Sequence, residues 1–122
     1  MDPYLLYKNL HRIGVFMVLV ALGGVTLHRI TGGTAEYPWR KFVAITHGVG
    51  LVLVLLGGFG MLARLGIHWP WPGWIMGKLL IWLVLGALLA VLARKPTLAK
   101  PLWWAIIVLA ALAAYLAANK PF

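Results

Sequence analysis

Basic and imidazole side chains at the borders of apolar runs are the residues of this sequence best suited to chemistry. Lys8, His11 and Arg12 open one such run in the stretch YLLYKNLHRIGV. Because residues three and four apart share a face of a helix, the three side chains span an arc of about 100°. Long basic side chains near the end of a membrane helix reach the interface with their stems in hydrocarbon. The alternative is a site for an anionic headgroup, a quinone oxygen or a carboxylate of another subunit.

Lys78 lies one turn inside a later apolar run and is expected on the same side of the membrane. Together with the three residues above, it is predicted to form one basic rim. The borders on the opposite side carry further candidates for contact with anionic lipid or an acidic partner: Arg40, Lys41, Arg94 and Lys95. Because these four are concentrated in two short loops, the positive-inside rule favours termini on the outer side of the membrane.

His47 lies inside the second run, about five residues from its start, or roughly 7–8 Å deep at the rise of a helix. Its helix face carries glycines, so the side chain is expected to face protein or a ligand rather than lipid. One interpretation is a neutral imidazole bonded to a backbone carbonyl or a hydroxyl of a neighbouring helix. The other is an axial ligand of a haem or of a chlorophyll-type pigment. The residues on or near its face are Gly50, Val54, Gly57 and Gly58.

Pairs of histidines do not suit a haem held by two imidazoles, which needs facing helices and similar depth. His28 and His47 differ by about five residues in depth, or roughly 7 Å. His11 would need a partner near the end of the second run, whereas His68 lies beyond that run among prolines. His47, His28 and His11 therefore stay candidates as single cofactor ligands. Four dispersed histidines without neighbouring cysteines or acids do not predict a metal site.

Acidic and thiol groups are too few for the common catalytic centres. Asp2 and Glu36 are the only carboxylate side chains, both lie outside the apolar runs, and there is no cysteine. The sequence thus offers no intramembrane carboxylate for proton or cation transfer, no Ser–His–Asp arrangement and no Gly-rich phosphate loop. We expect a protein that is not an enzyme.

Composition predicts a membrane protein. Hydrophobic residues make up 63% of the 122 positions, the mean hydropathy is +0.94 and the formal net charge is +9. A soluble domain of this length needs far more polar surface. Because the basic residues are scattered at borders instead of clustered on one exposed stripe, their expected counter-charges are anionic lipid headgroups and not nucleic acid.

Four apolar runs have the length of helices that cross the hydrocarbon core, about 17–25 residues each. Tryptophans mark their borders, as at a membrane interface, and Trp82 alone lies inside a run. The sequence predicts one all-α transmembrane domain over 1–122, a four-helix bundle with short loops and both termini on the same side. The first run also has features of a cleavable signal peptide, but we expect it to be retained as a span. The predicted spans are 4–28, 42–63, 74–93 and 102–118.

Small residues at helical spacing predict faces where helix backbones approach closely in lipid. Ala44 and Gly48 are four apart, as are Ala110, Ala114 and Ala118. We expect such faces to pack helices within the chain; the alternative is a groove that receives a partner helix or a flat cofactor. Further glycines of this kind are Gly23, Gly24, Gly57, Gly58 and Gly60.

Three stretches carry a family resemblance: LLYKNLHRIGV, ITHGVGLVLVLLGG and GWIMGKLLIWLVLGALLAVLARKP. Their marked residues are Lys8 and His11 in the first, His47 in the second, and Trp74 and Lys78 in the third. With these motifs the chain resembles, over most of its length, the SirB-like family of small four-span bacterial membrane proteins. The resemblance implies the architecture and draws attention to His11, His47 and Lys78, but implies no reaction. Family members tend to have an acidic residue three positions after the second-span histidine, where this chain has Gly50, so a proton-linked or cation-linked role is not implied.

These features predict a non-enzymatic membrane protein, an accessory or structural subunit that packs against other membrane helices and anionic lipids. An electron-transfer or pigment subunit that binds haem, a quinone or a chlorophyll-type cofactor through His47 is the first alternative. A small permease is the second. The expected partners are membrane lipids and other membrane subunits, and the expected location is the bacterial inner membrane.

Overall fold

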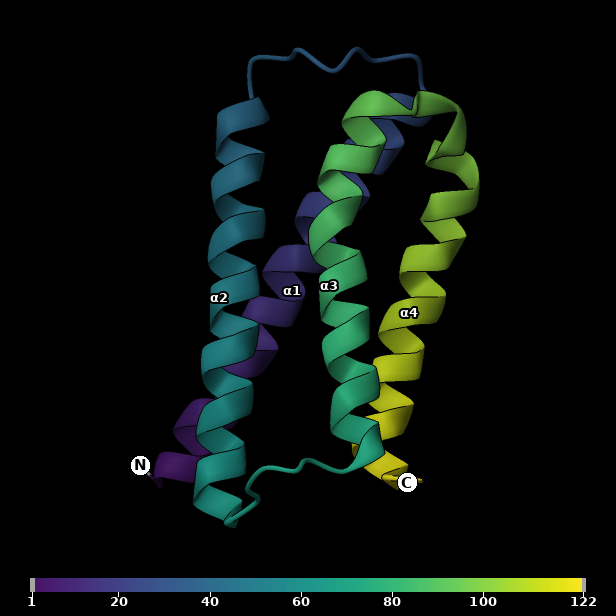
Figure 1. The fold of residues 1–122 in the computed structure, drawn as a ribbon. Helices are drawn as coiled ribbons and strands as arrows, with labels where there is room; N and C mark the ends of the chain where they lie inside the picture. The colour runs from purple at the N-terminus through teal and green to yellow at the C-terminus, as the bar shows by residue number, and fades with distance from the viewer. Residues whose placement is uncertain (1, 122) are drawn as a thin grey trace.

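The computed structural model describes residues 2–121, which form four long α-helices. Both ends of the chain lie at the same end of the bundle (Figure 1). All four helices are long and apolar enough to cross a membrane, which indicates an integral membrane protein. The predicted all-α four-helix bundle is confirmed. The elements are α1 (Pro3–Ile30), α2 (Arg40–Leu65), α3 (Gly73–Arg94), the short 3₁₀ helix η1 (Pro96–Leu98) and α4 (Ala99–Asn119).

The helices extend slightly beyond the predicted spans because their ends continue past the apolar residues. At the start of α1, the Asp2 side chain accepts a hydrogen bond from the backbone N–H of Tyr4, and Pro3 fits the first helical position. The fourth helix begins at Ala99, three residues before the predicted span. Pro101 is accommodated there because the first backbone N–H groups of a helix have no partner within the helix.

Helices α1 and α2 make the most extensive contact in the bundle, and glycines bring their backbones together. A Cβ atom added at Gly14 would lie 2.6 Å from the Gly50 carbonyl oxygen, and one at Gly50 would lie 2.9 Å from the Gly14 carbonyl oxygen. The predicted Ala44–Gly48 face is not this interface, because Ala44 is exposed and a Cβ at Gly48 would meet nothing within 4 Å. The same open surroundings hold for Gly23 and Gly24.

The buried core lies where α1 crosses α3 and α4. Leu22 of α1 and Leu92 of α3 are fully buried at its centre. Thr26 is also fully buried, and its hydroxyl donates to the Leu22 carbonyl oxygen at 2.5 Å. In Figure 1, α1 runs obliquely behind the other helices, while α3 and α4 stand together as a pair. Contact between α2 and α3 is sparse. We call the line along which these two helices face each other the seam.

Candidate functional site

Two cavities open along the seam between α2 and α3. One, at the end where the termini lie, has a volume of about 160 Å³ and is lined by Lys78 and Lys120; we call it the lysine cavity. The other, at the opposite end, has a volume of about 360 Å³ and is lined by Arg29 and Arg40; we call it the arginine cavity. On α3, Trp82 lies between the residues that line the two cavities, whereas on α2 Leu51 is the arginine-cavity residue nearest in sequence to the lysine cavity.

Two side chains along the seam bond to backbone carbonyls of the facing helix: Trp82, which lies between the cavities, and His47, which lines the arginine cavity. The Trp82 Nε1–H of α3 donates to the Leu51 carbonyl oxygen of α2 at 3.1 Å. In the reverse direction, His47 Nε2 of α2 donates to the Leu85 carbonyl oxygen of α3 at 3.1 Å. The expected bond between the His47 imidazole and a neighbouring helix is therefore present. An Nε2 atom that donates in this bond is not free to ligate a cofactor metal.

The lysine cavity combines basic side chains from three parts of the chain: one imidazole and two ammonium groups. His11 comes from α1, Lys78 from α3, and Lys120 directly follows α4. Aromatic side chains add to the lining, among them Phe59 and Trp74, and none of the described lining residues carries a carboxylate. A pocket with cations, aromatic walls and no acid suits an anion attached to an apolar body.

His11 is fixed in orientation by α2. Its Nδ1 lies 2.9 Å from the Val54 carbonyl oxygen, and because a carbonyl only accepts, Nδ1 donates. A neutral imidazole of this tautomer keeps a lone pair on Nε2. Two glycines of α2 leave space for His11. A Cβ atom added at Gly57 would clash with the His11 backbone nitrogen at 2.5 Å, and one added at Gly58 would lie 3.6 Å from Nδ1. The glycine face expected beside His47 therefore accommodates His11 at this end.

Lys120 is placed at the cavity by a left-handed backbone and an indole ring. It caps α4 with φ 46°, a conformation that glycine adopts most easily, and its N–H donates to the Leu116 carbonyl oxygen. Its Nζ lies 5.5 Å from the centroid of the Trp74 ring, within the range of a cation–π contact. Trp74 lies in the first turn of α3 and lines the same cavity, so both residues meet at its border.

The predicted basic rim is only partly assembled. His11 and Lys78 line the lysine cavity, but Lys8 and Arg12 do not. The Lys8 Nζ lies 6.0 Å from the Tyr4 ring centroid, and the Arg12 side chain is exposed. The difference arises because the α1 backbone at His11 packs against Gly57 of α2, which places the His11 ring at the seam and leaves Arg12 on the outer surface.

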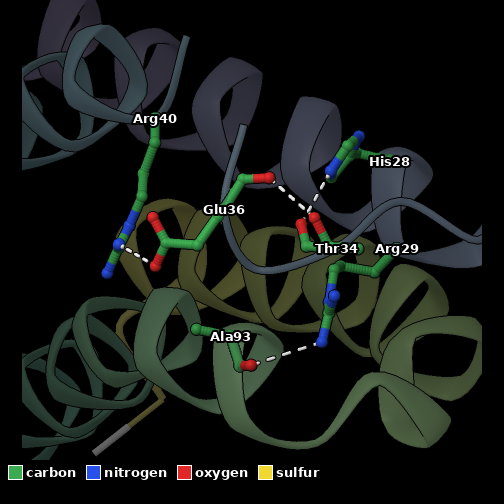
Figure 2. A network of polar contacts seen from close by, with 6 residues as sticks. All are labelled: His28, Arg29, Thr34, Glu36, Arg40 and Ala93. Atoms are coloured by element: carbon green, nitrogen blue, oxygen red, sulfur yellow. Dashed lines mark hydrogen bonds and ion pairs between the residues drawn. The ribbon is translucent and has the colours of Figure 1, made fainter. Parts of the chain in front are cut away.

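Arg29 ties the arginine cavity to the end of α3. Its Nε donates to the Leu92 carbonyl oxygen at 3.0 Å and its Nη2 to the Ala93 carbonyl oxygen at 3.2 Å. Its Nη1 donates to the Gly33 carbonyl oxygen at 2.7 Å. Figure 2 shows the contact with Ala93. The last carbonyls of a helix lack partners within the helix, so Arg29 of α1 satisfies carbonyls at the end of α3.

The loop before α2 holds an ion pair. The Arg40 Nη1 donates to Glu36 Oε1 at 2.6 Å, with both side chains exposed, and the Thr34 hydroxyl donates to the Glu36 carbonyl oxygen (Figure 2). Tyr37 lines the arginine cavity in the same loop. Burial raises the pKa of the Tyr37 phenol, against an opposing effect of the nearby Arg40 charge.

His28 contacts the loop between α1 and α2 and lines neither cavity. Its Nε2 donates to the Thr34 carbonyl oxygen at 2.9 Å (Figure 2). Its ring centroid lies 4.6 Å from that of Tyr37 and 5.1 Å from that of Trp39. The three candidate histidines thus occupy separate places: His11 at one cavity, His47 at the other, and His28 in the last turn of α1 against the loop.

The remaining residues predicted to contact lipid lie on the surface at the end of the bundle opposite the termini. Lys41, Arg94 and Lys95 are exposed there. The sequence did not predict that Arg29 and Lys120 line the cavities. It also did not predict the hydrogen bond that Trp82 donates to α2. One signal was present: Trp82 is the only tryptophan far from the borders of the predicted spans, and an indole N–H in an apolar setting needs a partner.

Comparison of the chain with protein families, with curated proteins and with solved structures gave no match.

Proposed function

We propose that the chain is a non-enzymatic accessory subunit of the bacterial inner membrane that binds anionic lipids and packs against other membrane helices. The observation that carries the proposal is a charge imbalance. The chain has eleven Lys and Arg, and among residues 2–121 only Arg40 forms a side-chain ion pair, with Glu36; eleven minus one leaves ten cations without an acidic partner. Anionic headgroups supply such counter-charges, worth about 1 kcal/mol for each basic residue near the surface.

The accessory role is supported by the outer face of α4. This helix is the least buried of the four spans. Ala114 and Ala118 are exposed on it at a spacing of four residues, which permits close approach of another helix in the membrane. The resemblance of the Lys8–His11, His47 and Lys78 motifs to the SirB-like family supports the bacterial location.

The two alternatives have less support. A haem or pigment held by His47 through Nε2 would have to break its bond to the Leu85 carbonyl. An absorption spectrum of the purified protein, with and without His47→Ala, tests this alternative. A permease needs polar groups along a path through the bundle, yet Tyr115 of α4 is 53% exposed on the outside.

Analysis of co-purified lipid tests the proposal. We expect protein extracted in mild detergent to retain more anionic lipid, relative to zwitterionic lipid, than the membrane from which it came. Replacing the exposed Lys41, Arg94 and Lys95 by Gln should lower that ratio, whereas Asn119→Ala, which changes an exposed uncharged side chain, should not. Retained lipid with the composition of the bulk membrane would contradict the proposal. Photo-crosslinking from Ala114 in native membranes tests the accessory role, which predicts a crosslinked polypeptide.

A further inference from the structure

We propose that the lysine cavity is a specific site for the phosphate group of an amphiphile with about two negative charges, such as a phosphatidic acid. The phosphate would lie between the ammonium groups of Lys78 and Lys120, and its singly protonated form would donate a hydrogen bond to the lone pair of His11 Nε2. This inference rests on the proposed binding of anionic lipid, and it adds a place and a headgroup class.

The two ammonium charges at the cavity favour a headgroup with about two negative charges. Lys78 and Lys120 line the same cavity, and no described lining residue is acidic. Two like charges at one partly buried place repel each other unless an anion lies between them. A phosphate monoester carries about −1.5 to −2 charge at pH 7, so it balances two ammonium groups better than the single charge of a phosphodiester.

The shape of the cavity suits a headgroup with a chain attached. Its volume of about 160 Å³ is close to the roughly 150 Å³ of a cavity that holds one benzene molecule. It therefore has room for a compact group and not for a whole tetrapyrrole. Leucines from both helices of the seam, Leu55 and Leu62 of α2 and Leu79 of α3, supply apolar walls for the first part of an acyl chain.

His11 and Lys120 are each held in place by a contact that leaves atoms available to bind a phosphate. Val54 fixes the His11 ring through Nδ1 and leaves Nε2 available. Trp74 holds the Lys120 ammonium over its ring, which leaves the ammonium N–H groups available for an anion. Lys120 also adopts the left-handed backbone conformation, at a conformational cost that glycine would avoid.

Native mass spectrometry of the full chain in detergent, titrated with short-chain lipids, tests the site. We expect phosphatidic acid to bind about tenfold more tightly than phosphatidylglycerol, the change that one charge-assisted hydrogen bond provides. Lys78→Gln and Lys120→Gln should each remove most of this preference, and Lys78→Arg should retain it. Lys95→Gln is the matched control because Lys95 is exposed at the opposite end. Circular dichroism checks that each variant keeps its helices.

The outcomes separate the site from the general function. Equal losses of phosphatidic acid binding in Lys78→Gln and Lys95→Gln would overturn the site but leave anionic lipid binding in place. No preference for either anionic lipid over phosphatidylcholine would contradict the proposed function as well. Inorganic phosphate that displaces phosphatidic acid at a similar concentration would show that the acyl chain contributes nothing, which overturns the amphiphile as ligand.

Discussion

The Trp82 indole on α3 donates its Nε1–H to the Leu51 carbonyl oxygen on α2 across a distance of 3.1 Å. The bond joins Trp82, which lies between the two cavities on α3, to Leu51, which lines the arginine cavity on α2, and direct contact between these two helices is otherwise sparse. A helix carbonyl that already accepts from its own helix has a second lone pair, so the bond adds to the helix ladder without replacing it. Together with the bond from His47 to Leu85, it ties α2 to α3 at and beside the arginine cavity.

Trp82→Phe should lower the free energy of unfolding by about 0.5–1.5 kcal/mol, because the variant loses the bond to Leu51 while keeping an aromatic ring. The measurement is unfolding of the detergent-solubilised protein with increasing sodium dodecyl sulfate. Trp104→Phe is the control, since Trp104 is 67% exposed on α4. Equal effects of the two substitutions would show that the seam bond contributes no stability.

A methyl group placed between α1 and α2 should destabilise the bundle. In Gly50→Ala the new Cβ would lie 2.9 Å from the Gly14 carbonyl oxygen, so the helices must move apart at a cost of about 1–3 kcal/mol. Gly48→Ala, two residues away, meets nothing within 4 Å and should be neutral or stabilising because alanine favours helix. Thermal unfolding in detergent compares the two. A lower melting temperature for Gly48→Ala than for Gly50→Ala would contradict the packing described for α1 and α2.

Arg29→Lys should be destabilising although it conserves charge. One ammonium group cannot reach the three carbonyls that the guanidinium contacts, on Gly33, Leu92 and Ala93. We expect a loss of about 1.5–3 kcal/mol in the free energy of unfolding. Arg94→Lys, at an exposed position in the last turn of α3, should change little. A fully stable Arg29→Lys variant would contradict the capping role.

The Tyr37 phenol should titrate above pH 10, because burial raises its pKa above the ordinary value of 10.0. Its neutral form is favoured in the folded protein, so this contribution to stability is intact below pH 10. It is lost as the pH rises from 10 through the higher pKa of the folded state. Ultraviolet difference spectra of the wild type and Tyr37→Phe isolate this phenol. A Tyr37 midpoint at or below pH 10 would contradict the burial of the ring.

The helices could be predicted because length and hydropathy are local properties of the sequence. Each predicted span lies within an observed helix, and the bond of His47 to a neighbouring helix followed from its depth in an apolar run. Which glycines pack could not be predicted, because that depends on where two helices cross. Gly14 and Gly50 meet at the crossing of α1 and α2, whereas Gly48 on another face of α2 meets nothing.

The cavities depend on contacts that no local pattern contains. Lys120 lies beyond the last apolar run, and only the fold brings it to Trp74 and Lys78. Arg29 reaches carbonyls that lie more than sixty residues later in the chain. Spacing alone placed Lys8 and Arg12 with His11, but the crossing of α1 over α2 separates them.

The most direct test of the account is a nuclear magnetic resonance titration of ¹⁵N-labelled protein in micelles with short-chain phosphatidic acid. We predict saturable shifts of the Trp74 indole N–H and of the backbone amides of Lys78 and Lys120, with much smaller shifts at Lys95. In Lys78→Gln the shifts at Trp74 should disappear. Shifts that are equally large at Lys95, or that persist at Trp74 in Lys78→Gln, would contradict a phosphate site in the lysine cavity.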